Sequence, residues 1–458
     1  MAKVCLLFLS MVLLFSLSFA QQPRKDKCQI QKINALQPKY KIQAEGGFTE
    51  SYDYNDDQFQ CAGAAFLRHT VYRRSLLLPS YTSSPLLAYA VKGNGIFGIM
   101  ISGCPETFES SQESQQESQG QRFRDRHQKI GNFRQGDVIA FPAGAAHWIY
   151  NNGNEDLVLV VLQHTSNAAN QLDEIPRRFF LAGNPQSGQE QGQQQWQPEQ
   201  QYSRFGNVFK GFPSHVLAEA FNVDQETAKK LQGENDQRGH MVNIEQGLQV
   251  ISPPFTGEEQ QYREQNRRAN GLEETICTAR VRQNIDNPVR ADIYNPRAGR
   301  FTTANSLTLP MLSFLQLSAA KGVLQGKAIM SPHWYMNCHT VVYVTRGNGR
   351  MQIVDNRGQA VFDDTIQEGQ VVVVPHNFAV VKQAGDEGFE WVEFNTNENA
   401  MINTLSGRTS SFRGLPVDVI ANAYQVSRQV AEQLKFNRKE TLIFSGGKSS
   451  RQPRVSSA

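Results

Sequence analysis

Apolar residues in this chain occur in short runs that are separated by turn residues. The runs are rich in Val, Ile, Phe and Tyr, and Gly, Asn and Pro interrupt them in both halves of the chain. Such a pattern predicts many short β-strands. The tripeptides Gly93-Asn94-Gly95 and Gly347-Asn348-Gly349 are interpreted as turns between strands. Each half is therefore expected to fold as an antiparallel barrel or jelly roll.

Two further segments have helical spacing instead. The first places four apolar residues on one helix face: Val216, Leu217, Ala220 and Phe221. Ser214 or its neighbour is expected to cap this helix, and the segment 417–424 repeats its pattern. A second helix is predicted after Asp224 and after Ser427. Each half thus ends in a short helical arm, whose apolar face needs a sister domain or subunit to pack on.

The two halves of the chain repeat one another. The matching blocks are 87–95 with 341–349, 136–142 with 369–375, and 213–231 with 416–434. Their offsets are 254, 233 and 203 residues. Three matched blocks in one order indicate an internal duplication, and hence two domains of the same fold.

The offset between matching blocks decreases along the chain, and each decrease shows where the first half carries an insertion. They fall at about 107–123 and 184–203, are rich in Gln and contain almost no aliphatic residues. A similar polar stretch, 257–270, separates the halves. Such segments bury too little apolar surface to offset chain entropy, so we expect two disordered loops and a flexible linker. The expected domains are 21–256 and 271–458.

The first twenty residues carry the pattern of a secretory signal. Lys3 precedes an apolar run over 4–19, and small residues stand at Ser18 and Ala20. Residues 1–20 are therefore predicted to be a signal peptide, because the run is shorter than a bilayer span requires. No later stretch is long enough to cross a bilayer, so no membrane partner is expected.

Charge and cysteine content narrow the class of protein. The formal net charge of +3 is too small for a general nucleic-acid binder, so no nucleic-acid partner is expected. After removal of the signal peptide five cysteines remain: Cys28, Cys61, Cys104, Cys277 and Cys338. Disulfides are expected in an oxidising compartment, but four cysteines can pair in three ways and their spacing does not choose among them.

One motif resembles a signature of the cupin superfamily. Gly136, Pro142, Gly144, His147 and Asn151 match the second cupin motif at every fixed position. The resemblance implies a mainly β protein of two tandem cupin domains, which are jelly-roll β-barrels, each followed by a short helical arm.

The metal ligands of cupin enzymes are mostly replaced in this chain. The family uses two His and one Glu from a first motif and the His of the second. With the first motif aligned on Gly93, the first-domain positions are Pro79, Tyr81, Leu86 and His147. The second-domain positions are His333, Tyr335, Thr340 and Val380. A catalytic metal needs about three protein ligands, so we expect no catalytic residue, no metal, no cofactor and structural roles for both histidines.

Other enzyme signatures are not found in the sequence. It contains no Gly-x-Ser-x-Gly, no phosphate-binding loop followed by Lys, and no His-Glu-x-x-His. Cys338 precedes His339, but adjacent strand residues face opposite sides and make a poor nucleophile–base pair. Cys338 is therefore interpreted as a spare buried thiol.

The segment after the polar linker carries a more specific resemblance. Asn270-Gly271-Leu272-Glu273-Glu274-Thr275-Ile276-Cys277 closely resembles the processing site of the 11S (legumin-type) seed storage globulins, where an asparaginyl endopeptidase cleaves after the Asn. Cleavage between Asn270 and Gly271 gives an N-terminal chain of net charge −2, counted from residue 21, and a C-terminal chain of net charge +4. An acidic and a basic chain are the arrangement of this family.

The same resemblance implies the cysteine pairing and the assembly. Family members join a Cys near the mature N-terminus to one after the first strands, here Cys28 to Cys61. They also join the acidic chain to the basic chain, here Cys104 to Cys277. The family assembles as trimers before cleavage and as hexamers after it, in the protein storage vacuole of the seed.

Three functions are compared on this basis. The first is a non-catalytic storage protein that carries nitrogen in its Gln-rich segments and is mobilised by proteolysis on germination. The second is a cupin enzyme with an unusual metal set, and the third is a non-catalytic cupin that binds a small ligand. The replaced ligand positions favour the first over the second.

Overall fold

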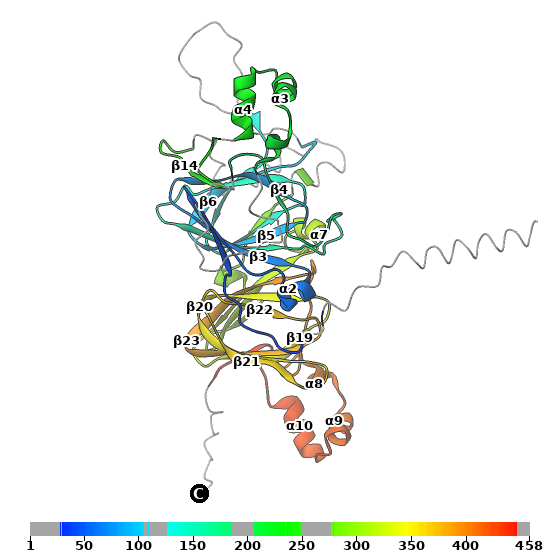
Figure 1. Cartoon of the computed structure of the whole chain (residues 1–458). Coiled ribbons are helices and arrows are strands. Elements are labelled where there is room, and N and C mark those ends of the chain that lie inside the picture. The colour runs from blue at the N-terminus through cyan, green and yellow to red at the C-terminus, as the bar shows by residue number, and fades with distance from the viewer. Residues whose placement is uncertain are drawn as a thin grey trace, which may run out of the picture.

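The computed structural model of the 458-residue chain describes residues 28, 30–104, 108–109, 126–184, 206–233, 235–248, 276–277 and 279–446. Two jelly-roll domains are stacked along a long axis, and a pair of helices projects at each end (Figure 1). The expected mainly β fold with two barrels and two helical arms is confirmed.

The N-terminal domain consists of two antiparallel sheets that face each other. Its strands are Tyr40–Ala44 (β1), Gly47–Ser51 (β2), Ala65–Val71 (β3), Ser75–Thr82 (β4), Leu86–Lys92 (β5), Asn94–Met100 (β6), Ile130–Arg134 (β9), Asp137–Phe141 (β10), Ala146–Tyr150 (β11), Leu157–Gln163 (β12), Arg178–Phe180 (β13), Met241–Asn243 (β14) and Arg282–Asn284 (β15). The larger sheet has the order β1-β2-β3-β12-β5-β10-β15, and the smaller has the order β13-β4-β11-β6-β9, with β14 on β4. A separate pair joins Phe108–Glu109 (β7) to Arg126–His127 (β8), and Asp57–Ala62 (α2) leads into β3.

The C-terminal domain forms one ten-stranded sheet that closes on itself. Its strands are Ile293–Asn295 (β16), Gly299–Ala304 (β17), Ser318–Leu324 (β18), Ile329–Tyr335 (β19), Thr340–Val354 (β20), Ala360–Gln367 (β21), Val371–Val374 (β22), Ala379–Asn395 (β23), Ile402–Thr404 (β24) and Ile443–Phe444 (β25). The long strands β20 and β23 pair with each other along most of their length. Because β20 also pairs with β22 at its start and with β21 further on, it connects the two faces of the barrel.

Neither Gly-Asn-Gly tripeptide forms a hairpin: the first joins two strands of different sheets, and the second lies within one strand, so the interpretation of the second as a turn between strands is wrong. The strands β5 and β6 on either side of Gly93 belong to different sheets and do not pair with each other. Gly93 has a φ of +84°, which glycine adopts without a steric penalty. The second tripeptide lies within β20, where its pairing with β23 shifts register between Gly347 and Gly349. At Gly93 the chain crosses from one sheet to the other, whereas at 347–349 it continues along β20 within one sheet, so it does not reverse at either point.

The helical arms carry the predicted helices with one difference in capping. The helices are Ser214–Phe221 (α3), Gln225–Gln232 (α4), Ser411–Gly414 (α8), Val417–Tyr424 (α9) and Arg428–Phe436 (α10), with a 3-10 turn at Val208–Gly211 (η2) before α3. A second 3-10 turn, Pro288–Arg290 (η3), lies outside the arms, between β15 and β16. The helices α4 and α10 begin directly after Asp224 and Ser427, as predicted, and the side chains of both residues cap them. Ser214 is instead the first residue of α3, and Pro213 stands at the cap position without a side-chain hydrogen bond. The ring of proline fixes its φ, here at −60°, and this value lets a helix begin without strain.

The two domains share strands and a common core. The β15 strand comes from the C-terminal half of the sequence but pairs with β10 of the N-terminal sheet. In the opposite direction, Leu36 forms an antiparallel bridge with Val371 of β22. Phe66 packs against Tyr343 and Phe394 with ring centroids 5.7 Å apart in each case. One continuous cluster of buried apolar side chains therefore joins the barrels, while Met311–Leu315 (α7) covers β10.

Candidate functional site

The interior of the N-terminal barrel holds the positions of the first cupin ligand set. His147 on β11 and Ser80 on β4 are register partners, and both are buried. Leu86 is buried on β5 opposite Phe141, whose ring centroid lies 4.5 Å from that of His147. An apolar side chain therefore stands at the carboxylate position of the family's metal set, among other apolar side chains.

The assignment of Pro79 and Tyr81 to the two histidine positions is wrong by one residue. Ser80 and Thr82 are buried, whereas Pro79 and Tyr81 are only partly buried, and Tyr81 stacks on Phe179. Successive strand residues face opposite sides of a sheet. An alignment that places the two histidine positions one residue too far from Gly93 therefore assigns them to residues on the wrong face of β4. The neutral hydroxyl groups of Ser80 and Thr82 are not among the usual zinc ligands. The shift by one residue therefore adds no ligand, and His147 is still the one retained ligand of this set.

His147 is a neutral, hydrogen-bonded core residue. Its Nδ1–H donates to the carbonyl oxygen of Ala145 over 3.2 Å. Burial, with a smaller contribution from the positive charge of Arg178, lowers the pKa of His147 to about 3. These properties fit the structural role that the sequence predicts for this residue.

Two further buried histidines share this barrel, and sequence reasoning missed them. The Thr49 hydroxyl lies 2.8 Å from His69 Nδ1 and 2.7 Å from His240 Nε2. One hydroxyl can donate to only one ring, so it donates to one histidine and accepts an N–H from the other. Burial lowers the pKa of His240 to about 3 and that of His69 well below its ordinary value. No local signal reveals this group, because its members come from segments far apart in the sequence.

The second ligand set, in the C-terminal barrel, also retains one histidine. His333 on β19 is a register partner of Val380 on β23, and its Nδ1–H donates to the carbonyl oxygen of Ser331 over 2.7 Å. Burial, with a smaller contribution from Lys382, lowers the pKa of His333 to about 3. An aliphatic side chain therefore stands where the family places its fourth ligand.

The other positions of the second set belong to a buried polar network around Glu393. The hydroxyl of Tyr335 donates to one oxygen of this carboxylate. Lys382 Nζ and Trp391 Nε1 lie 3.2 and 3.0 Å from the other oxygen. Thr340 donates to Asn395 Oδ1 over 2.7 Å. The Glu393 carboxylate thus has three donors within the protein and compensates the positive charge of Lys382.

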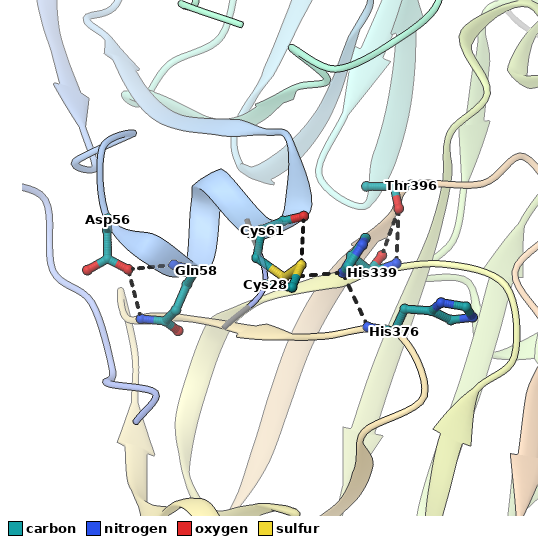
Figure 2. Close-up of a disulfide and its surroundings, with 7 residues drawn as sticks. All are labelled: Cys28, Asp56, Gln58, Cys61, His339, His376 and Thr396. Carbon is teal, nitrogen blue, oxygen red and sulfur yellow. Dashed lines mark hydrogen bonds between the residues drawn. A yellow bond between two sulfur atoms is a disulfide. The ribbon is translucent and has the colours of Figure 1, made fainter. Parts of the chain in front are cut away.

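A group of side chains that could share a metal ion lies outside both barrels. Among the residues that the structure describes, one set of three His, Cys, Asp or Glu side chains meets the distance requirement: Cys28, Cys61 and His339. The two sulfur atoms form a disulfide beside the His339 ring (Figure 2). The sequence did not suggest this group, because its members are up to 311 positions apart and belong to different domains.

Both implied disulfides are confirmed. Cys28 is bonded to Cys61, and Cys104 is bonded to Cys277. The second bridge has a sequence separation of 173 residues and joins the two halves of the chain. Among the described cysteines Cys338 is the free one, and burial raises the pKa of its thiol to about 12. The interpretation of Cys338 as a spare buried thiol is therefore confirmed.

Several predicted segments lie wholly or mainly outside the described residues. They are the signal peptide 1–20, the Gln-rich stretches 107–123 and 184–203, the linker 257–270 and the processing site Asn270–Gly271. None of the helices that the structure describes is long and apolar enough to span a membrane.

One apolar pocket lies on the outer face of the smaller N-terminal sheet, with a volume of about 280 Å³. Trp148, Ile99, Met100 and Leu248 contribute to its wall, and Lys129 stands at the same site. The pocket is separate from the barrel interior, because Trp148 is on the face of β11 opposite to His147.

Comparison with known proteins agrees with the duplicated fold. The family described as Cupin matches residues 33–187 and 283–432. Among curated proteins, 11S globulin of Juglans nigra is 51% identical over 95% of this chain and 93% of its own length. The 11S globulin seed storage protein 1 of Carya illinoinensis is 50% identical, with coverages of 95% and 94%.

Solved structures give the same result. Procruciferin, the 11S globulin from Brassica napus, matches with a TM-score of 0.81 and 40% identity over 93% of this chain and all of its own. A structure described as "11S globulin from Wrightia tinctoria reveals auxin binding site" has the same TM-score and identity and covers 93% of this chain and 98% of its own.

The fold and the two incomplete ligand sets define a two-domain cupin in which each metal ligand set retains one of its four ligands. The chain belongs to the 11S (legumin-type) seed storage globulins. Its similarity to these proteins supports a role in seed storage.

Proposed function

We propose that this chain is a nitrogen reserve without catalytic activity. The observation that carries the proposal is the loss of the metal set in both barrels, where buried Leu86 and Val380 replace ligands. Neither side chain has a donor atom, and a catalytic metal needs about three protein ligands. Metal analysis of protein purified without reductant tests the proposal, because stoichiometric manganese, iron or zinc would overturn it.

The reserve role fits the composition of the chain. Gln carries a second nitrogen in its side chain, and it is abundant in the stretches 107–123 and 184–203. The proposed route is secretion through the signal peptide 1–20 into the protein storage vacuole of the seed, followed by proteolysis on germination. Similarity to seed storage globulins supports the seed as the site of storage.

The proposed maturation is cleavage between Asn270 and Gly271 by an asparaginyl endopeptidase. The bond between Cys104 and Cys277 supports it, because these residues lie on either side of the cleavage site. A cleaved molecule would therefore remain covalently joined as an acidic and a basic chain.

Reduction is expected to split the mature protein into a larger acidic chain and a smaller basic chain, with Gly271 as the new N-terminus. Reducing and non-reducing gel electrophoresis with N-terminal sequencing measures this. Cys277→Ser should let the halves separate without reductant, and the matched control Asn270→Gln should stay uncut. A new N-terminus at Glu273 or later would show that the protease cleaves at a different bond. An uncut mature chain would exclude processing.

The helical arms are the proposed surface of self-assembly. Of the seventeen large apolar side chains that are exposed among the described residues, ten belong to the arm segments: Phe212, Val216, Phe221, Val223, Leu415, Val419, Tyr424, Val430, Leu434 and Phe436. The arms project at opposite ends of the molecule (Figure 1). Head-to-tail contacts between such ends can close into a ring. Family resemblance supplies the numbers, a trimer before cleavage and a hexamer of two stacked trimers after it.

Phe221→Glu and Leu434→Glu are each expected to weaken this assembly by roughly ten-fold or more, because burying such a side chain stabilises an interface by about 1.5–3 kcal/mol. Sedimentation or light scattering of the unprocessed protein measures the change. Lys229→Glu is the matched control, since it places the same carboxylate at an exposed polar position of α4. Retention of the wild-type mass by both arm variants would exclude this interface.

A second candidate function is small-ligand binding at the apolar pocket beside Trp148. The wall of this pocket is mostly apolar and Lys129 is among its lining residues, a combination that suits an aromatic carboxylate such as an auxin. The neighbour from Wrightia tinctoria is described with an auxin-binding site. Calorimetric titration with an auxin tests the candidate, with Trp148→Ala as the variant that should lose binding; equal binding by both proteins would exclude this pocket.

A further inference from the structure

A second apolar surface lies at the junction of the two domains, away from the helical arms. Seven of the seventeen large apolar side chains that are exposed among the described residues lie outside the arm segments, and five of these seven belong to loops or a short helix at the junction: Leu172, Leu307, Phe314, Met336 and Met401. Leu307 is 80% exposed and Leu172 is 58% exposed. Side chains of this kind gain free energy when a partner removes them from water.

The five side chains belong to one continuous surface. It consists of the segments 166–172, 305–316, 335–339, 374–378 and 396–401, here called the junction surface. Three hydrogen bonds of 2.9 Å connect neighbouring segments: Asn167 Nδ2 donates to the Leu315 carbonyl oxygen, the Ser306 N–H to that of Glu398, and the Met336 N–H to that of Met401. Segment 374–378 is joined by the contact of His376 Nε2 with the Met336 carbonyl oxygen over 2.7 Å. The helix α7, which is part of this surface, and β19, which leads into it, lie on one side of the molecule between the two arms (Figure 1).

The junction surface carries almost no charge. Glu398 is the one Asp, Glu, Lys or Arg residue in its 35 positions, although these four types make up 19% of the chain. Charged neighbours stand at its edge: Arg280 donates to the carbonyl oxygen of Thr308 over 2.8 Å, and Asp173 forms an ion pair with Arg177. An apolar centre with a polar rim is the usual composition of a protein–protein interface.

We propose that the junction surface binds a second copy of this chain in a two-fold symmetric contact. In such a contact the same surface serves both partners, so each charged residue near the axis meets a charge of its own sign. Like charges that face each other across an interface are costly, and an uncharged surface avoids this cost. A strongly charged partner would instead find no opposite charges at the centre of this surface to pair with. The charge distribution therefore fits a copy of the chain, and Leu307, Phe314 and the two methionines supply the apolar contact.

This contact goes beyond the assembly that we propose for the arms. The arms project at the two ends of the molecule and the junction surface lies between them, so a copy that docks here leaves both arms free (Figure 1). Molecules that are already joined through their arms can therefore be linked further through the junction surface. Such links suit the dense packing of a reserve protein, a purpose that rests on the proposed function.

Light scattering of the unprocessed chain with blocked arms, Phe221→Glu/Leu434→Glu, isolates the contact. This variant is expected to form dimers as its concentration rises to about 1 mM. Adding Leu307→Glu/Met401→Glu should weaken dimerisation roughly hundred-fold, because each buried apolar side chain contributes about ten-fold. Val289→Glu is the matched control, since Val289 is 91% exposed but lies outside the junction surface, and it should leave dimerisation unchanged. Added salt should also have little effect, because few charges take part in the contact.

Oxidation of methionine by hydrogen peroxide locates the contact in the wild-type chain. The peroxide transfers one oxygen atom to the thioether sulfur and leaves water, so the rate depends on access to the sulfur. Met336 and Met401 are exposed on the junction surface, whereas the arm segments 206–233 and 411–436 contain no methionine. Mass spectrometry should show that oxidation of both slows as the protein concentration rises, roughly ten-fold where about nine-tenths of the chains are paired. Met100 is half-buried in the pocket beside Trp148 and should react at a constant rate, as the internal control.

Three results would each overturn the proposal. The first is an arm variant that stays monomeric at every concentration up to about 1 mM. The second is a dimer that Leu307→Glu/Met401→Glu does not weaken, and the third is oxidation of Met336 and Met401 at a rate that does not change with concentration. An arm variant that keeps the wild-type mass would contradict the arm interface instead, and the oxidation rates of the two methionines then decide on the junction surface, because they do not report on the arms.

Discussion

Replacement of Glu393 by Gln is expected to lower the free energy of unfolding by about 3–5 kcal/mol. Glu393 and Lys382 are both fully buried, and their side chains form an ion pair of 3.2 Å inside the C-terminal barrel. The neutral amide of Gln removes the negative charge but leaves the positive charge of Lys382 buried, with the Trp391 ring 5.1 Å away. A buried charge without a counter-charge is far more costly than either the intact pair or its complete removal. Urea unfolding monitored by circular dichroism measures the loss.

The double variant Glu393→Gln/Lys382→Met separates this effect from simple repacking. It removes both charges with side chains of similar volume, so it should recover most of the stability that Glu393→Gln loses. Arg350→Met/Asp363→Asn is a matched control, because the same kind of charge pair lies at the surface and its loss should cost less than about 1 kcal/mol. A single Glu393→Gln variant as stable as the double variant would show that Lys382 does not require its partner.

Acidification from pH 6.5 toward pH 3 is expected to reduce the stability of the folded chain steeply. The pKa values of His147, His240 and His333 are lowered from the ordinary 6.5 to about 3, chiefly by burial. Between these values the unfolded chain binds a proton at each histidine that the folded chain does not bind, so stability decreases as the pH falls. At pH 4 the loss is roughly 3 kcal/mol for each histidine, since one pKa unit corresponds to about 1.4 kcal/mol. Above pH 6.5 these groups should contribute no pH dependence.

Urea titrations at pH 7 and at pH 4 measure this expectation. His147→Leu removes one of the titrating groups, so the difference in stability between the two pH values should become smaller by roughly 3 kcal/mol. His215→Leu is the matched control, because His215 is exposed on α3 and the same substitution there should leave the difference unchanged. If both variants lose stability with acid as much as the wild type does, protonation of the buried His147 is not a cause of the acid sensitivity.

Local patterns in the sequence were sufficient for the elements that depend on nearby residues. The helices α4 and α10 begin after Asp224 and Ser427, because a cap needs an acceptor only three positions from the N–H that it accepts. The internal repeat likewise predicted two similar barrels. Two halves that carry the same apolar blocks in the same order can bury these blocks in the same fold. Recognition of the family supplied both disulfide pairings, which spacing alone had left open.

The sequence pattern does not contain the details that decide which face of a sheet a strand residue occupies and which strand it pairs with. The inward positions of β4 are Ser80 and Thr82, because one residue more or less in a spacing reverses the face that a strand presents. The same limit applies to Gly93, where the local signal of a turn is equally compatible with a hairpin and with a corner between two sheets.

The sequence by itself thus determined the class of protein: two duplicated β domains, their helical arms and the replaced metal ligands. The tertiary structure decided which distant side chains meet. The bond of Thr49 to His69 and His240, the ion pair of Glu393 and Lys382, and the approach of His339 to a disulfide of the other domain exist only in the folded chain. The physical reason is that local periodicity reports interactions over a few residues, whereas closed sheets and packed domains bring together positions that are hundreds of residues apart.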